Sequence, residues 1–447
     1  MKLSKFNLWV EDYPASSDYV VFNTRTQALI KINREFKENL DKLSSLQSTV
    51  HSPQIKDKLD SLKENGIIVE DEKEEEGKLK DFFRQLKYES HTLPFEVTLL
   101  TTYSCNFRCV YCFEESVKDN VFLSKETGEA AVKWLIKTAE KRGFKRLFLV
   151  YYGGEPLLNP EPIYDISCRL TEWSQNNGTG FGFGIITNGS LVTAGLIDKL
   201  LTVGLKEIRI TLDGDRDAHN QKRPFSDGRP SFDLIINNIK SVIDKVAVGV
   251  TGNFDRQNFE SIPRLLDYLE KEGLLHKLQK VDFAPISPRL GPKSNPGAIE
   301  LGECLSFLDK DGLFKEVLAI KKELMRRGVK INTGLAINAC ALIMQDGGVT
   351  IDPKGAIYKC NALLGYPEFS IGNVREEEFN GRYLDFLNID AWNKCPQDCP
   401  YVPMCQGGCR FFSYLEKKNF TDLSCKREYL NRIVPELIKL EYEKLKR

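Results

Sequence analysis

Apolar and polar positions follow two alternating periods in the middle of the chain. Short runs rich in β-branched residues are followed by longer stretches in which apolar residues recur every three to four positions. This order predicts an α/β fold of parallel strands joined by crossover helices. The expected strands are 95–101, 146–151, 182–187, 206–212, 246–252 and 280–285. Six such units predict a partial (β/α)6 barrel of the TIM type, with functional residues at the carboxyl ends of the strands.

The first 90 residues have a pattern typical of a small α+β domain. Strand-like segments come first and are joined by turn-forming residues, and helical periodicity follows. The charged run 70–78 is either a solvated connector or the start of a helix. The expected elements are strands at 6–10, 19–24 and 66–70 and helices at 28–43 and 55–64.

Length and charge narrow the possible functions. A chain of 447 residues is too long for one ordinary core, so two to three domains are expected. The 63 basic and 63 acidic residues cancel, which argues against nucleic acid or an anionic membrane as a partner. No apolar run is long enough to span a membrane, and no signal-peptide core follows Met1. A cytoplasmic location is therefore expected.

Ten of the twelve cysteines are grouped, which favours metal binding over disulfides in a long intracellular chain. Cys105, Cys109 and Cys112 lie within eight residues after the first expected barrel strand. An iron–sulfur cubane normally takes four thiolates, so three leave one iron open. A zinc knuckle is the alternative, although structural zinc takes four ligands that come in pairs. The isolated Cys168 and Cys304 are expected to be packed core thiols.

The spacing C-x3-C-x2-C, with Tyr111 directly before the last cysteine, resembles the signature of radical S-adenosylmethionine (SAM) enzymes. The resemblance implies that Cys105, Cys109 and Cys112 hold a [4Fe–4S] cluster whose open iron binds the methionine moiety of S-adenosyl-L-methionine. Reductive cleavage of that cofactor would give a 5′-deoxyadenosyl radical, which abstracts hydrogen from the substrate. These cysteines are thus the candidate catalytic residues.

A second motif follows the second expected strand, and polar residues lie at the ends of the third, fourth and fifth expected strands. Gly153-Gly154-Glu155-Pro156 resembles the GGEP motif of the same family, which implies that Glu155 binds the amino group of the cofactor. By itself such a sequence is a commonplace turn. Arg223 is expected either to meet a carboxylate or to tie down a long loop. His219 and 227–229 also follow the pattern of relatives with extra clusters. The further candidates for cofactor binding are Tyr111, Thr187, Asn188, Asp213 and Asn253.

Seven cysteines near the C-terminus resemble a SPASM domain. The pattern runs C-x(9–15)-G-x4-C, then C-x2-C-x5-C-x3-C, then C, and this chain has one extra residue between Cys395 and Cys399. The resemblance implies two auxiliary [4Fe–4S] clusters, and so three in all. One would be fully ligated by Cys395, Cys399, Cys405 and Cys425, and the other held by Cys340, Cys360 and Cys409.

The second of these sets is one ligand short. Residues 341–347 lack the additional cysteine of fully ligated relatives, so an iron stays open unless Asp346 or another oxygen ligand fills it. An open iron invites a substrate thiolate. A water ligand, or a cluster used only to pass electrons, is an equal alternative.

The order of elements before residue 90 resembles the winged-helix domain that binds leader peptides in peptide-maturing enzymes. A leader would then add a strand to an exposed sheet edge. A structural cap is the alternative. The expected division is a leader-binding domain at 1–90, a radical SAM barrel at 91–290, a bridging helical segment at 291–335 and a SPASM domain at 336–447.

Together these resemblances, which cover roughly 95–425, imply an enzyme that modifies a ribosomally made precursor peptide and forms a cross-link, such as a thioether. A flavodoxin or ferredoxin would supply electrons. A sulfatase-maturing enzyme that forms formylglycine is the alternative within the class. A non-catalytic electron-transfer protein is the alternative outside it, and this alternative leaves the GGEP motif unexplained.

Overall fold

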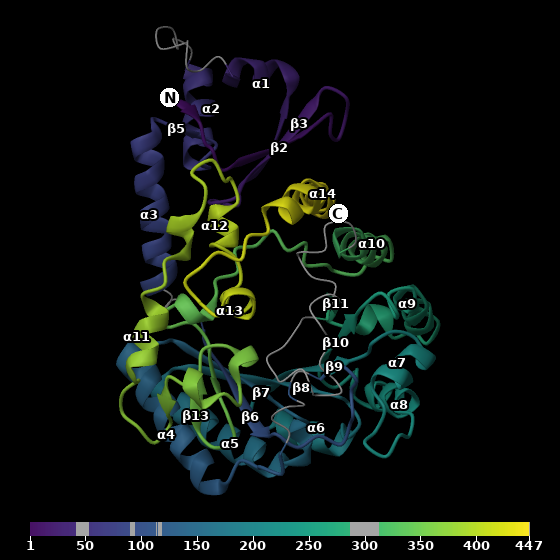
Figure 1. The fold of residues 1–447 in the computed structure, drawn as a ribbon. Coiled ribbons are helices and arrows are strands. Elements are labelled where there is room, and N and C mark those ends of the chain that lie inside the picture. The colour runs from purple at the N-terminus through teal and green to yellow at the C-terminus, as the bar shows by residue number, and fades with distance from the viewer. Residues whose placement is uncertain (42–52, 90–93, 113, 115–118, 287–312, 447) are drawn as a thin grey trace. The chain divides into compact units, whose positions relative to one another are not determined.

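The structure is a computed structural model that describes residues 1–41, 53–89, 94–112, 114, 119–286 and 313–446 (Figure 1). It divides into two compact units, and each is described by itself. Unit 1 comprises Met1–Glu89, Asn332–Cys340 and Ile389–Arg447, and unit 2 comprises Ser90–Ile331 and Ala341–Asn388. The cysteine-rich C-terminal segment is therefore shared between the two units.

Unit 2 is built on a nine-stranded sheet in the order β11-β10-β9-β8-β7-β6-β12-β13-β14. The six strands expected from the sequence form its parallel part, each within two residues of its expected bounds. They are β6 (Phe95–Thr102), β7 (Arg146–Gly153), β8 (Gly180–Thr187), β9 (Leu205–Thr211), β10 (Ala247–Phe254) and β11 (Lys280–Pro285). The predicted α/β class with a partial TIM-type barrel is confirmed.

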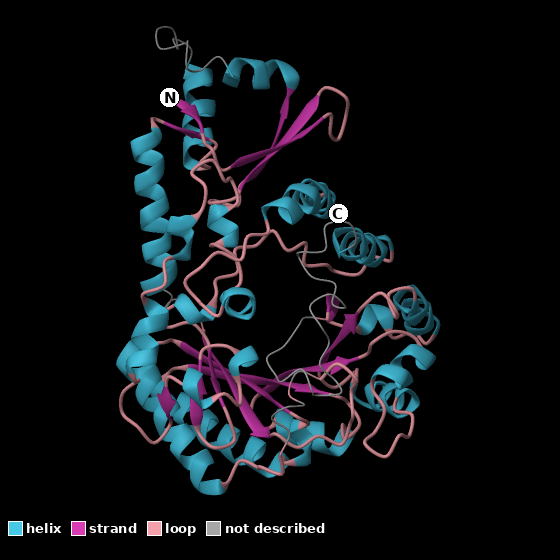
Figure 2. Ribbon diagram, viewed as in Figure 1, coloured by secondary structure: helices cyan, strands magenta, loops and turns pink. Residues whose placement is uncertain are grey.

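Helices alternate with these strands and pack against the sheet (Figure 2). The core between the two layers contains fully buried apolar side chains such as Leu99, Phe183, Ile208 and Val248. Helix boundaries follow local signals: Ser124 caps the start of α4, and Gly143 ends it in the left-handed conformation. The helices of this unit are α4 (Lys125–Arg142), α5 (Pro160–Asn177), α6 (Ala194–Leu201), α7 (Arg216–Lys222), α8 (Phe232–Val242), α9 (Ser261–Lys271), α10 (Leu313–Arg326) and α11 (Gly381–Leu387).

Three short strands from the C-terminal part of the chain extend this sheet beyond β6. They are β12 (Val349–Ile351), β13 (Ala356–Tyr358) and β14 (Gly372–Asn373). β12 runs parallel to β6, and the two following strands are antiparallel to their neighbours. Residues 341–388 are thus part of the same compact unit as the barrel.

Unit 1 contains the small α+β arrangement expected at the N-terminus. A three-stranded antiparallel sheet has the order β2-β3-β4, and β1 pairs with β5. The strands are β1 (Lys2–Leu3), β2 (Asn7–Glu11), β3 (Asp18–Asn23), β4 (Leu29–Asn33) and β5 (Ile68–Val69). The helices are α1 (Arg34–Asp41), α2 (Pro53–Glu64), α3 (Glu72–Tyr88), α12 (Val402–Cys405), α13 (Arg410–Lys417) and α14 (Arg427–Leu445). The small core includes Val21, Ile32, Leu40, Leu62 and Ile68.

Two sequence expectations are corrected. The helix expected from residue 28 begins only at Arg34, because Leu29–Asn33 pairs with β3 as a strand. Cys168 is exposed rather than packed in the core. Helix α5 buries the stripe Ile163, Ile166, Ser167, Leu170 and Trp173, and Cys168 lies outside that stripe. Cys304 lies outside the described residues. None of the helices in the described ranges is long and apolar enough to cross a membrane.

Candidate active site

The loop of Cys105, Cys109 and Cys112 follows β6 and is held by main-chain hydrogen bonds to the segment after α7. The Arg108 N–H donates to the Pro224 carbonyl at 2.9 Å, and the Val110 N–H donates to the Lys222 carbonyl at 3.1 Å. The rings of Phe107 and Phe225 meet edge to face, with centroids 4.7 Å apart. The cysteine loop is therefore positioned by residues more than a hundred positions away.

The three thiols of this loop interact with one another electrostatically. Burial raises the pKa of the Cys105 thiol to about 12, and Glu155, Cys109 and Cys112 act in the same direction. Because a thiol must lose its proton to bind iron, loading such a site releases protons. No three His, Cys, Asp or Glu side chains of the described residues are close enough to share a single metal ion.

The motif Gly153-Gly154-Glu155-Pro156 lies at the end of β7, and its two glycines pack against Thr102 and Ser104, just before the cysteine loop. Gly153 has a φ of +130°, and a Cβ atom there would lie 2.2 Å from the Thr102 carbonyl oxygen. A Cβ atom on Gly154 would lie 2.2 Å from the Ser104 carbonyl oxygen. The glycines thus let two backbones approach each other. The Pro156 carbonyl accepts a hydrogen bond from the Thr101 hydroxyl at 3.1 Å.

The Glu155 carboxylate is fully buried and joins the ends of β7 and β8. Its oxygens accept from the Thr187 hydroxyl at 2.7 Å, the Asn188 N–H at 2.7 Å and the Leu157 N–H at 3.1 Å. Burial raises the pKa of this carboxyl, and the three donors oppose that shift. The contact to a cofactor amino group stays a prediction; the contacts that Glu155 forms within the described residues are those to the end of β8 and to Leu157.

Asn188 continues this network to the cysteine loop. Its amide donates to Asn106 Oδ1 at 2.8 Å and lies 4.0 Å from the Cys105 sulfur. Its carbonyl oxygen accepts from the Ser190 hydroxyl at 2.7 Å, and the Asn106 amide donates to that same hydroxyl at 2.9 Å. The end of β8 is therefore hydrogen-bonded directly to Asn106, the residue beside Cys105.

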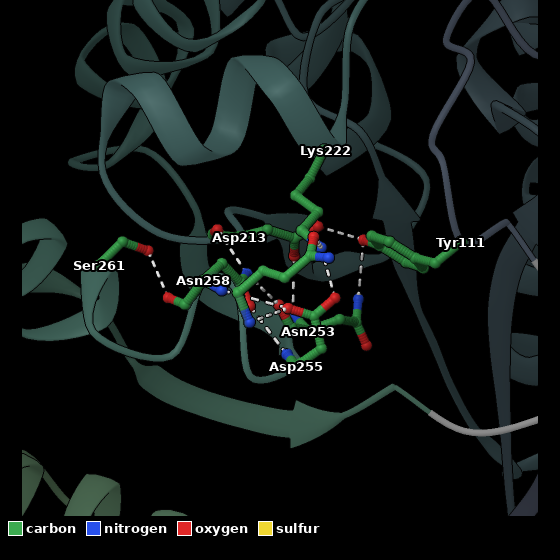
Figure 3. Close-up of polar contacts among 8 residues, drawn as sticks. Tyr111, Asp213, Lys222, Asn253, Asp255, Asn258 and Ser261 are labelled. Carbon is green, nitrogen blue, oxygen red and sulfur yellow. Dashed lines mark hydrogen bonds and ion pairs between the residues drawn. The ribbon is translucent and has the colours of Figure 1, made fainter. Parts of the chain in front are cut away.

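A second buried carboxylate, Asp213, lies at the end of β9 and binds Tyr111. The Tyr111 hydroxyl donates to Asp213 and accepts from the Asn253 amide at 3.1 Å, as Figure 3 shows. The Asn253 N–H donates to the other Asp213 oxygen at 2.7 Å. Asn258 donates to the main-chain carbonyls of Asp213 and Asn253. The ends of β9 and β10 are thereby fixed to the aromatic residue of the cysteine motif.

Arg223 is the positively charged residue that contacts Tyr111 and Asp213. Its Nη1 atom donates to the Tyr111 hydroxyl at 2.6 Å and lies 3.8 Å from Asp213 Oδ2. Its Nε atom is buried and has no hydrogen-bond partner among the described residues. Burial raises the pKa of Asp213, and the Arg223 charge opposes that shift. A buried donor without a partner fits a bound anionic group such as a carboxylate.

His219 supports the same segment from its buried position in α7. Its Nδ1 atom accepts from the Asp213 N–H at 3.2 Å, and its Nε2 atom lies 3.1 Å from the Ser231 hydroxyl. Burial lowers its pKa, which favours the neutral ring. Asp227 and Arg229 pair with each other at the surface at 2.7 Å. Of these sequence candidates, His219 is built into the site and the exposed pair is not.

The C-terminal cysteines of unit 1 form a second group. Cys395, Cys399, Cys405 and Cys425 line one small cavity together with Arg427. Burial raises the pKa of the Cys395 thiol to about 12, and the other three thiols add to that shift. Beside them, Gln406 is buried in the left-handed conformation, and its side-chain amide has no partner among the described residues. Four soft thiols and an amide without a protein partner fit an iron–sulfur cluster.

The remaining three cysteines fall in different units. Cys340 and Cys409 belong to unit 1 and Cys360 to unit 2, so their predicted ligand set stays a prediction. Asp346, the alternative oxygen ligand, lies 3.5 Å from Arg142 in an ion pair within unit 2.

Several polar residues of the site were not predicted from the sequence. Asn106 and Asn258 join strand ends that are far apart in the chain. Lys222 binds Asp255 and donates to Gln257 at 3.2 Å, beside the Asp213 network (Figure 3). Tyr152 interacts electrostatically with Cys105, Cys112 and Arg223. For Tyr152, the only signal in the sequence is its position directly before the two glycines of the motif.

Comparisons with known proteins agree with this site. Residues 99–269 match the family model of the Radical SAM superfamily. The cysteine-type anaerobic sulfatase-maturating enzyme of Clostridium novyi is 24% identical over 329 residues, covering 69% of this chain and 85% of that protein. Those residues are thus a radical SAM domain, and members of that superfamily are enzymes.

Two solved structures share the fold. Native anSMEcpe with bound AdoMet and Cp18Cys peptide has a TM-score of 0.62 and 16% identity, covering 78% of this chain and 99% of that one. Streptococcus suis SuiB bound to precursor peptide SuiA has a TM-score of 0.55 and 14% identity, covering 95% and 99%. The cysteine-rich C-terminal segment agrees with a SPASM domain.

Proposed function

We propose that this enzyme modifies a ribosomally synthesised precursor peptide, abstracting hydrogen from an unactivated carbon and forming a cross-link such as a thioether. The observation that carries the peptide assignment is the α+β arrangement at the start of unit 1. Among the described strands, β2 and β4 are the two edges of this sheet and each pairs with β3 alone; α14 packs near β2 and α1 near β4. In this proposal a leader segment adds to the outer edge of β4 by main-chain hydrogen bonds.

The proposal assigns the cofactor to the carboxyl ends of β6–β10. S-adenosyl-L-methionine, bound to a [4Fe–4S] cluster on Cys105, Cys109 and Cys112, supplies a 5′-deoxyadenosyl radical. The chain positions that cofactor and excludes water. The Nε donor of Arg223 provides a partner for a carboxylate. The proposed contacts are Tyr111, Gly153, Gly154, Glu155, Pro156, Thr187, Asn188, Asp213, Arg223 and Asn253.

Two auxiliary [4Fe–4S] clusters complete the proposal, in the ligand sets predicted from the sequence. The four cysteines around one cavity support the fully ligated cluster. An open iron on the other cluster would bind a substrate thiolate, which suits thioether formation. Electrons would come from a flavodoxin or ferredoxin in the cytoplasm.

A sulfatase-maturing activity is the second candidate, because the Clostridium novyi relative named for that activity covers 69% of this chain. Such an enzyme would oxidise a cysteine or serine to formylglycine. The two candidates differ in their need for a leader. Formylglycine made from serine is lighter by two hydrogens, as a thioether is, so the aldehyde group rather than the mass distinguishes the two products.

Label transfer tests the proposal. The cluster-loaded enzyme is given S-adenosyl-L-methionine, dithionite and a deuterated precursor peptide encoded beside its gene, with and without the leader. We expect deuterium in 5′-deoxyadenosine and a peptide product lighter by two hydrogens only when the leader is present. Cofactor cleavage without transfer of label from any such peptide would reject the peptide assignment. A formylglycine product independent of a leader would favour the second candidate.

A further inference from the structure

Arg410 is a buried arginine in unit 1, directly after Cys409. It is 1% exposed, and its five guanidinium N–H groups all donate to main-chain carbonyls. The Nη1 atom donates to Phe420 at 2.9 Å and to Asp422 at 2.6 Å. The Nη2 atom donates to Gly407, and to Gly408 at 3.0 Å, while Nε donates to Gly408 at 3.3 Å. The side chain thus joins the loop between Cys405 and Cys409 to the turn 420–422.

The charge of this guanidinium is not balanced by a carboxylate. Within the described residues, no Asp or Glu side chain forms an ion pair with Arg410. Asp422 offers its main-chain carbonyl to Arg410, and its carboxylate binds Lys394 at 2.7 Å, so that it interacts with Arg410 only electrostatically and less than with Lys394. Carbonyl dipoles satisfy the donors but leave a full positive charge in the interior, and a buried charge is costly unless something pairs with it.

Apart from the Asp422 carboxylate, which is paired with Lys394, the groups of the described residues that can supply negative charge near Arg410 are thiols. Arg410 interacts electrostatically with Cys340, Cys409, Cys405 and Cys395. These four cysteines come from both predicted auxiliary ligand sets. These cysteines would become thiolates on binding a cluster, and the cluster also contains inorganic sulfide. Both would add negative charge close to Arg410.

We propose that Arg410 is the cation that balances the negative charge of the auxiliary iron–sulfur clusters and raises their reduction potential. The inference rests on the proposed function insofar as that function places clusters on these cysteines. Reduction adds one electron to a cluster, so a nearby fixed positive charge stabilises the reduced form. Arg410 is a positioning and charge-balancing residue and makes no contact with substrate.

The test compares Arg410→Gln with Arg410→Lys in full-length protein. Both are made in a background where Cys105, Cys109 and Cys112 are Ala, so that only auxiliary signals are present. Iron is counted, and the potentials are measured by a dithionite titration followed by electron paramagnetic resonance. We expect Arg410→Gln to shift the reduction equilibrium at least tenfold toward the oxidised form, which is about 59 mV per electron. Arg410→Lys should retain most of the potential because it retains the charge.

Arg427→Gln is the matched control. Arg427 lines the four-cysteine cavity, but Asp398 already pairs with it at 2.7 Å. Removing a charge that a surface carboxylate neutralises should shift the potentials much less.

Four results decide the proposal. Potentials unchanged in an iron-replete Arg410→Gln protein would overturn it, as would equal shifts in the Gln and Lys variants. Equal loss of iron from both variants would also overturn it, because it would show that Arg410 acts only through its carbonyl contacts. A background protein with no iron at all would reject the auxiliary clusters themselves, and hence that part of the proposed function.

Discussion

Both units bury an arginine close to cysteines, and the two arginines are compensated in different ways. Arg223 of unit 2 lies 3.8 Å from the Asp213 carboxylate and donates to Tyr111, whereas Arg410 of unit 1 donates only to main-chain carbonyls among the described residues. The charge of Arg223 is thus balanced within the chain before any cofactor binds. That of Arg410 is left for a bound anion. We infer that Arg223 orders the cofactor site, whereas Arg410 raises the reduction potential of the auxiliary clusters proposed beside it.

The largest expected effect is at the cysteine loop beside Arg223. Cys109→Ala removes one of the three thiols of that loop, and a cubane cannot be held open for a cofactor by two. Cofactor cleavage should fall below detection, and the iron content should drop from about twelve to about eight per chain. Chromatography of 5′-deoxyadenosine and an anaerobic iron count measure both.

Cys168→Ala is the matched control, because this thiol is exposed on α5 and lies outside every proposed ligand set. It should leave iron content and cleavage unchanged. Normal cleavage by the Cys109→Ala protein would contradict the proposed cofactor site.

The next effect comes from removing the carboxylate that balances Arg223. Asp213→Asn leaves the guanidinium buried without its partner and places an amide donor against the Tyr111 hydroxyl or the Asn253 N–H. Breaking a buried pair in this way costs about 3–5 kcal/mol. Hydrogen exchange of the β9 and β10 amides in the cluster-loaded protein should report that loss locally.

Asp227→Asn is the control for this change, since Asp227 pairs with Arg229 at an exposed site. It should cost less than about 1 kcal/mol. Equal protection in the Asp213→Asn and wild-type proteins would show that Arg223 does not depend on Asp213.

A smaller effect is expected at the other buried carboxylate. Glu155→Gln keeps the shape but turns one acceptor into a donor that faces Thr187, Leu157 or Asn188, which costs about 1–3 kcal/mol. Burial raises the pKa of Glu155, so the folded state holds a proton where the unfolded chain has lost it. Wild-type stability therefore falls as pH rises from the ordinary glutamate pKa through the raised folded-state pKa, and the variant lacks this slope.

Urea unfolding of both proteins at several pH values measures that difference. The cost of Glu155→Gln should be greatest at the acidic end of the range and shrink as pH rises. Glu161→Gln, at an exposed position in the first turn of α5, should change stability by less than about 0.5 kcal/mol. A cost of Glu155→Gln that grew with pH would contradict the raised pKa.

The fold of unit 2 could be predicted from the sequence because its strands carry a strong signal. Most of these strands are short runs rich in apolar residues, and β9 and β11 alternate buried apolar with polar positions; both patterns predict strands, and all six agree within two residues. β12, β13 and β14 have only two or three residues each, too few to show any period. The sequence predicts a helix over Leu29–Asn33 because its apolar residues also fit the helical period of the following segment. Only pairing with β3 distinguishes the two readings.

The candidate site was predictable where it depends on local spacing and unpredictable where it depends on distant contacts. The spacing of Cys105, Cys109 and Cys112 and the Gly153–Gly154 turn are local features. The hydrogen bond between Asn188 and Asn106 joins residues 82 positions apart, and no sequence pattern around either residue predicts it. The sequence alone allows two roles for Arg223, and in the structure it lies beside Asp213 and donates to Tyr111. Arg410 carried no signal beyond following Cys409.

The smallest expected effect sharpens the contrast between the two arginines. Tyr111→Phe keeps the aromatic ring but removes the hydroxyl that joins Arg223, Asp213 and Asn253. Arg223 Nη1 is already 3.8 Å from Asp213, so the two charges can close into a direct pair. The loss should therefore be limited to about 1 kcal/mol, well below that of Asp213→Asn. In a double-mutant cycle measured by hydrogen exchange, the two changes should be non-additive because they share partners. A Tyr111→Phe cost equal to that of Asp213→Asn would show that the hydroxyl, rather than the carboxylate, compensates Arg223.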